Sequence, residues 1–135
     1  MGIDNLNHQQ QMSGLANKQP ISYLTKDEQI AVIFDRVAAY NQIHDTSKPL
    51  FFDTETTGGG REDQIIEIAF CDSDRNLIID TLIYTDRPSS PGAFKVHGIY
   101  PHELIGKPTF IDIQPAVVQL LKGRTLYAYN ASFDV

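Results

Sequence analysis

The 135-residue sequence has little cysteine, no long apolar run and a deficit of positive charge. Its single cysteine, Cys71, excludes an internal disulfide framework and fits a reducing compartment. No apolar run approaches the roughly 20 residues that span a bilayer, and no signal peptide precedes a cleavage site. These absences predict a cytoplasmic protein of one domain, with no membrane among its partners.

The negative net charge argues against a nucleic-acid duplex as the partner. The sequence holds 11 Lys and Arg against 17 Asp and Glu, for a net charge of −6, whereas duplex readers carry a basic surface. An enzyme that grips only a few terminal nucleotides needs much less basic surface. Bound divalent cations would also add positive potential where a phosphate must lie. The acidity therefore does not exclude binding to a nucleic-acid end.

The chain begins with a polar segment and an amphipathic helix. Residues 1–24 have little to bury, so we expect a disordered tail. The sequence from Thr25 to Glu28 reads T-x-x-E, a capping box that starts a helix. Apolar residues then recur at helical spacing, at Ile30, Ile33, Phe34 and Val37. We therefore predict a helix at residues 25–45, and prefer packing on the domain to the alternative of binding a partner.

Three extended segments follow, at residues 50–55, 64–72 and 76–84. Stretches rich in Gly, Asp and Ser supply the turns between them. The first segment is apolar on both faces, which is typical of a central strand. We expect these segments to form neighbouring strands of one sheet.

A helix and a fourth strand complete the predicted order. Residues 113–122 have an apolar helical face and stop before Gly123, a common helix terminator. Residues 125–129 form a short apolar strand, and Asn130 is placed to cap a further helix. The order β-β-β-α-β-α predicts an α/β fold.

Two carboxylates, Asp53 and Glu55, stand one residue apart at the end of the first predicted strand. Side chains at i and i+2 of a strand share a face, so the two acids would project together. Such close like charges repel unless one is protonated or a cation neutralises the pair, and oxygen ligands suit Mg²⁺ or Mn²⁺. The alternative is a solvated strand end with two surface acids.

Five segments, in this order and at these spacings, resemble the DEDD (DnaQ-like) superfamily of 3′–5′ exonucleases. The likeness is strongest to the epsilon proofreading subunits of bacterial DNA polymerase III. D-x-E alone is common, whereas the ordered set is a specific pattern. The segments are Asp53–Gly58, Gln64–Phe70, Val96–Ile99, Lys107–Phe110 and Asn130–Asp134.

The resemblance implies a ribonuclease H-like fold, a mixed sheet flanked by helices, in which the fourth strand lies beside the first. It also implies a two-metal site for Mg²⁺ or Mn²⁺. In that site Asp53 bridges both ions, while Glu55 and Asp134 each bind one. These three residues are the implied catalytic and metal-binding acids.

The resemblance further implies residues that contact the substrate. The turn of Thr56, Thr57 and Gly58 would bring backbone amides close to the 3′-terminal nucleotide, since Gly permits close approach. His97 would lie near that nucleotide, although an ordinary hydrogen-bonded loop histidine is nearly as good an interpretation. Phe133 would contact a base, and packing in the core is the alternative that we prefer.

The resemblance covers residues 49–135, which we interpret as the N-terminal part of a DEDD exonuclease domain. In that family a histidine general base and a fourth acid follow the second motif, whereas this sequence ends at Val135. We therefore expect the C-terminal part of the fold to be missing and the activity of this chain to be uncertain.

The implied function is a metal-dependent 3′–5′ exonuclease that removes nucleotides from 3′ ends of DNA, as in proofreading. Its implied partners are a single-stranded 3′ end and a DNA polymerase subunit. One alternative is a catalytically inactive fragment that binds nucleic acid or a polymerase partner. Another is an exonuclease that trims RNA or oligoribonucleotides.

Overall fold

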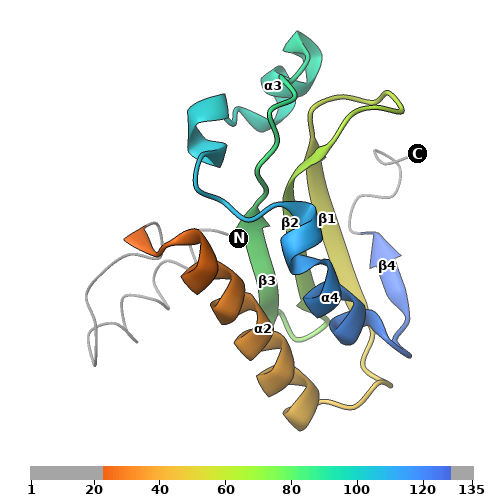
Figure 1. Cartoon of the computed structure of the whole chain (residues 1–135). Helices are drawn as coiled ribbons and strands as arrows, with labels where there is room; N and C mark the ends of the chain where they lie inside the picture. Colours follow the sequence, from red (N-terminus) through yellow and green to blue (C-terminus); the bar gives the residue numbers. More distant parts are fainter. Residues whose placement is uncertain (1–22, 129–135) are drawn as a thin grey trace.

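A four-stranded mixed sheet organises residues 23–128, the part of the chain that the computed structural model describes (Figure 1). Its strands are β1 (Leu50–Thr56), β2 (Ile65–Asp72), β3 (Leu77–Leu82) and β4 (Leu126–Ala128). They lie in the order β3-β2-β1-β4. β1 runs antiparallel to β2 and parallel to β4. The predicted central position of the first strand, with the fourth strand beside it, is confirmed, and with it the ribonuclease H-like α/β fold.

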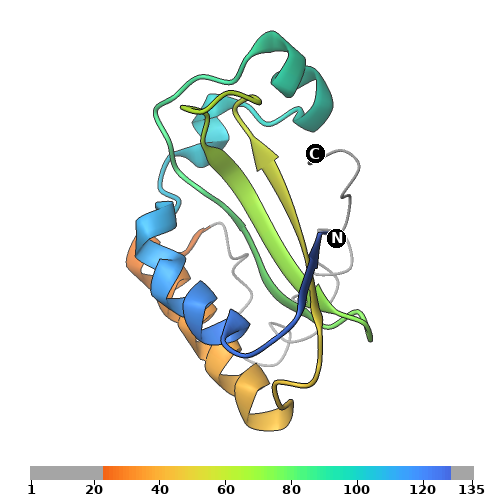
Figure 2. The ribbon, with the colours of Figure 1, turned by 90° about the vertical axis from the view of Figure 1, so that its right-hand side faces the viewer.

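Two helices, α2 (Lys26–Ile43) and α4 (Phe110–Leu121), lie on the same side of the sheet (Figure 2). Their apolar faces and the strands form one core. At its centre Leu50 is fully buried, and burial of such a side chain contributes roughly 1.5–3 kcal/mol. The cluster comprises Ile33, Val37, Tyr40, Leu50, Ile68, Phe70, Ile78, Ile79, Ile83, Ile113, Ala116, Val117 and Leu120. The expectation that the first predicted helix packs on the domain is therefore confirmed.

Capping boxes fix where these two helices begin. In α2 the Thr25 hydroxyl accepts from the Glu28 amide at 3.1 Å, and the Glu28 carboxylate accepts from the Thr25 amide at 2.8 Å. α4 begins in the same way with Thr109 and Asp112. The predicted start of α4 at Ile113 is wrong, because this second capping box sets the helix three residues earlier.

The segment between β3 and α4 contains two helices that the predicted order omits. α3 (Pro91–His97) starts at Ser90, whose hydroxyl accepts from the Ala93 amide, and it stops at Gly98 with a φ of 65°. A 3₁₀ helix, η2 (Pro101–Leu104), follows. His97 is thus the last residue of a helix rather than a loop residue. The sequence did contain signals for α3, because Ser90 followed by Pro91 favours a helix start and Gly98 favours a helix stop.

Arg124 joins the turn after α4 to the segment between α2 and β1. Its guanidinium donates to the backbone oxygens of His44, Asp45 and Lys48 at 2.7 to 3.0 Å, which joins the end of α2 to the start of β1. The same group lies over the ring of Tyr40, 5.0 Å from its centroid. Together these contacts hold the turn after α4 against the end of α2 and the start of β1.

Several predictions concern residues outside the described range. They are the polar tail, the helix after Asn130, and the roles of Phe133 and Asp134. Within residues 23–128, no helix is both long and apolar enough to cross a membrane.

Candidate metal and nucleotide site

β1 carries Asp53 and Glu55 on the face of the sheet opposite to α2 and α4. Strand alternation separates them from Leu50 and Phe52, which pack toward the helices. Within the described residues β4 pairs with β1 only as far as Phe52. The two half-buried carboxylates therefore follow the last β1–β4 pair that the described residues form.

A cavity of about 540 Å³ lies between the end of β1 and α3. Glu55, Thr56 and Gly58 form one wall, and His97 belongs to the other. The fold thus brings the predicted D-x-E-T-T-G segment and the predicted V-H-G-I segment to one site. The remaining lining residues are Phe52, Thr54, Gly59, Ser90, Gly92, Ala93 and Val96.

Thr57 is oriented away from this cavity and fully buried. Its amide donates to the Gln64 carbonyl at 2.9 Å, and its hydroxyl accepts from the Gln64 amide at 2.9 Å. The predicted approach of its amide to a nucleotide does not match this geometry, because the amide is already hydrogen-bonded. Thr57 instead holds the turn in which Thr56 and Gly58 face the cavity.

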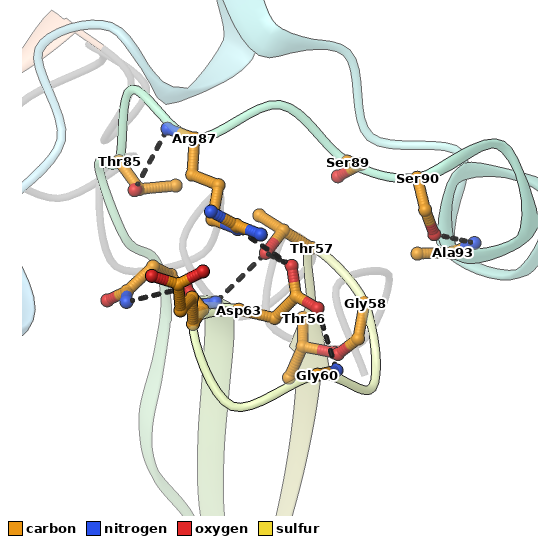
Figure 3. Close-up of polar contacts among 12 residues, drawn as sticks. Thr56, Thr57, Gly58, Gly60, Asp63, Thr85, Arg87, Ser89, Ser90 and Ala93 are labelled. Carbon is orange, nitrogen blue, oxygen red and sulfur yellow. Dashed lines mark hydrogen bonds and ion pairs between the residues drawn. The ribbon is translucent and has the colours of Figure 1, made fainter.

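Asp63 anchors the glycine turn that follows β1 (Figure 3). One carboxylate oxygen accepts from the Thr57 hydroxyl at 2.8 Å and from Arg87 Nε at 2.9 Å. The other accepts from the Gly60 amide at 2.8 Å. The turn is tight, since a Cβ on Gly58 would lie 2.6 Å from Asp63 Oδ2. These bonds, with that of Arg87 first, lower the pKa of Asp63 to about 2.

His97 is fixed in one tautomer by two hydrogen bonds. The Ile99 amide donates to Nδ1 at 2.9 Å, so Nδ1 carries no proton. Nε2 lies 3.1 Å from the Ser89 hydroxyl, and in the neutral ring Nε2 is the nitrogen that carries the proton. Burial lowers the pKa of His97, which favours the neutral ring. The side chain therefore presents a neutral aromatic surface at the cavity.

Two more acids, Glu67 and Asp80, lie on the same face of the sheet as the predicted metal ligands. Glu67 stands directly opposite Glu55 in the β1–β2 ladder, and Asp80 opposite Ala69 in the β2–β3 ladder. Burial, followed by the charges of Asp80 and Glu55, raises the pKa of Glu67 to about 7. Sequence analysis missed this pair, although Glu67 interrupts the apolar run of β2.

The donor set at the end of β1 fits a hard cation. Two carboxylates on one face supply the oxygen ligands that Mg²⁺ and Mn²⁺ prefer. Burial, and after it the charges of Asp80 and Glu55, raise the pKa of Glu67 beside them. Among residues 23–128, no group of three or more His, Cys, Asp or Glu side chains is arranged to hold a metal. The role of Asp53 and Glu55 as metal ligands stays a prediction, and the third predicted ligand, Asp134, is outside the described residues.

Comparison with known proteins gives one family match. Residues 50–135 match the family model described as Exonuclease. The matched region begins with β1 and includes both sequence segments that line the cavity. α2 lies outside this region, although its side chains belong to the same core.

Three relatives illustrate the similarity. The chain is 41% identical over 108 residues to the DNA polymerase III subunit epsilon of Treponema pallidum (strain Nichols), covering 77% of this chain and 49% of that protein. It is 36% identical over 85 residues to the "Uncharacterized exonuclease CP81" of Escherichia phage 186, with coverages of 63% and 44%. For the DNA polymerase III subunit epsilon of Escherichia coli (strain K12), identity is 33% over 99 residues, with coverages of 66% and 41%. The chain thus spans less than half the length of these relatives.

Proposed function

Because the chain belongs to the Exonuclease family, we propose that it contributes to a metal-dependent 3′–5′ exonuclease acting on DNA ends. The single observation that carries this proposal is the position of Asp53 and Glu55. They lie on one face of β1, beyond the last β1–β4 pair of the described residues, and Glu55 lines a cavity that His97 also lines. The alternative, a solvated strand end with two surface acids, does not explain why Glu55 lines a cavity or why the region matches the Exonuclease family.

In this proposal Asp53 and Glu55 hold divalent cations, Mg²⁺ or Mn²⁺, together with Asp134. Bound cations would polarise a phosphodiester and lower the pKa of a bound water. The protein's own contribution is to fix two carboxylates on a rigid strand whose pairing with β2 continues past both residues. Asp53 would hold a cation together with Glu55, whose side chain lines the cavity.

The cavity is the proposed site for the 3′-terminal nucleotide. Thr56 and Gly58 border it on the side of the carboxylates, and the neutral ring of His97 borders it on the other. A neutral aromatic surface suits contact with a sugar or base better than contact with a phosphate. For Phe133, packing in the core is the preferred role, and contact with the base is the alternative.

Degradation of a 3′-labelled or 5′-labelled single-stranded oligonucleotide, with Mg²⁺ or Mn²⁺, tests the proposal directly. Any trimming by the chain should release a 3′ label first and shorten a 5′-labelled strand stepwise, and it should disappear in Asp53→Ala and Glu55→Ala. Asp35→Asn is the matched control, because Asp35 is an exposed acid on α2. Activity that persists in both β1 variants would overturn the assignment of the site.

Calorimetric titration with Mn²⁺ examines the metal site separately from turnover. Binding should weaken strongly in Asp53→Ala and stay unchanged in Asp35→Asn. Equal binding in all three proteins would refute the metal site. A wild-type chain that binds Mn²⁺ without degrading DNA would favour the role of a binding fragment instead.

The substrate and partner are narrower proposals. Two of the three relatives described above are subunits of DNA polymerase III, which supports DNA as the substrate and a polymerase subunit as the partner. The phage relative carries only the name of an exonuclease. The same assay with an RNA oligonucleotide of identical sequence distinguishes the two sugars, since faster trimming of RNA would replace DNA as the substrate.

A further inference from the structure

We propose that Asp63 and Arg87 are positioning residues, which form a polar brace that holds the two walls of the cavity together. The brace is defined by Asp63, Arg87, Thr57 and Ser90. It joins the glycine turn after β1 to the segment that leads into α3 (Figure 3). This inference rests on the proposed function, because it concerns the site in which a nucleotide would bind.

On the first wall, Asp63 determines the shape of the turn. Its carboxylate accepts three hydrogen bonds, from the Thr57 hydroxyl, the Gly60 amide and Arg87 Nε. A carboxylate with several donors of this kind stays ionised and fixes the backbone that supplies them. The cavity residues Gly58 and Gly59 lie between two of these anchoring points.

On the second wall, the segment before α3 is tied to the same turn. The Ser90 amide donates to the Thr57 carbonyl at 2.8 Å, and Ser90 is the N-cap of α3. Arg87 reaches across from this segment to Asp63. Ser89, between these two connections, makes the hydrogen bond to His97. The position of His97 relative to Gly58 therefore depends on the brace.

The rest of the fold offers α3 little other support. No residue of α3 is fully buried, so apolar packing alone holds this helix weakly. A short helix at the surface needs polar anchors to keep a side chain within a fraction of an ångström. Arg87 and the Ser90 amide are the anchors that the described residues provide at its start.

The test compares the full chain with Arg87→Gln, Asp63→Asn and Arg87→Lys by hydrogen exchange and NMR. Exchange of the Ser90 amide reports the bond to Thr57, and the ring signals of His97 report the second wall. We expect Ser90 exchange to accelerate roughly twofold to fivefold in Arg87→Gln, and more in Asp63→Asn. The Ile68 amide of β2, in the core, should not change, and Arg87→Lys should recover part of the protection.

Lys48→Gln is the matched control. It removes another ion pair, between Lys48 and Asp74, away from the cavity. This variant should leave Ser90 exchange and the His97 signals unchanged. If Asp63→Asn fails to fold, Arg87→Gln alone still decides the outcome, because Arg87 is exposed.

Binding of thymidine 5′-monophosphate with Mg²⁺ connects the brace to the site. Affinity should fall roughly twofold to fivefold in Arg87→Gln and stay at the wild-type value in Lys48→Gln. Unchanged Ser90 exchange, or unchanged nucleotide affinity, in Arg87→Gln would overturn the positioning role. A wild-type chain that does not bind the nucleotide, with Ser90 responding as expected, would instead overturn the proposed function and support the brace.

Discussion

Replacing Glu67 by Gln should stabilise the folded chain above neutral pH and have no stabilising effect in acid. Glu67 faces Glu55 across the β1–β2 ladder and is hydrogen-bonded to Asp80. Its folded pKa of about 7 lies above its ordinary value of 4.5, so the folded chain binds the proton more tightly than the unfolded chain. The resulting stabilisation is complete below the unfolded pKa and is lost as the pH rises through the folded pKa.

The size of the effect follows from the pKa difference. A rise from 4.5 to about 7 corresponds to roughly 3 kcal/mol, at about 1.4 kcal/mol for each pKa unit. Glu67 is only half-buried, and solvent screening reduces the expected loss to roughly 1–2 kcal/mol. Gln carries no charge and can still hydrogen-bond Asp80, so Glu67→Gln should gain this amount above the folded pKa.

Urea denaturation of both proteins between about pH 4 and pH 8 measures the difference in the free energy of unfolding. Glu62→Gln, at an exposed position in the turn, controls for the change in net charge. Saturating Mg²⁺ should narrow the difference, because a cation at Asp53 and Glu55 would offset the negative charge near Glu67. A difference between wild type and Glu67→Gln that is constant with pH would refute the reasoning.

Three further substitutions test the packing described above, each by the midpoint of urea denaturation. Gly58→Ala should destabilise the chain by roughly 1–3 kcal/mol, because its Cβ would meet the anchoring carboxylate at 2.6 Å, whereas Gly59→Ala meets nothing within 4 Å and should be tolerated. Tyr40→Phe removes the 2.7 Å bond to the buried carboxylate of Asp72 and should cost roughly 1–2 kcal/mol; no loss would mean that water replaces the hydroxyl. Thr109→Ala breaks the capping box of α4 and should cost about 1 kcal/mol; an unchanged midpoint would mean that the cap is dispensable.

The strands and the first helix were predictable from the sequence because their signals are local. The apolar run at Leu50, the T-x-x-E box at Thr25 and the turn after Asp72 each specify an element within a few residues, and the structure contains each of them. The site was predicted from the ordered set of segments, since the pair of acids at Asp53 and Glu55 alone is a common pattern. The second motif, Asn130–Asp134, lies outside the described residues and stays a prediction.

The contacts that shape the cavity could not be predicted in the same way. Asp63 and Arg87 are separated by the whole of β2 and β3, and neither has a sequence pattern that specifies its partner. Glu67 interrupts an apolar run in the sequence, but its raised pKa depends on burial and on acids from two other strands. These features arise from tertiary packing, which periodicity and capping rules do not describe. The missed α3 is different, since Ser90 and Pro91 did contain a signal for its start.

The mixed pairing of β1 also bears on the order of events during folding. β1, β2 and β3 are joined by short turns, so their antiparallel ladders close small loops. β4 reaches β1 only after the chain has passed through α3, η2 and α4, which makes this parallel pairing the slow, long-range step. Pulse-labelled hydrogen exchange during refolding should therefore protect β2 amides before those of β4, and simultaneous protection would contradict this order. Asp53 and Glu55 are accordingly aligned by local pairing with β2, before the last strand is added.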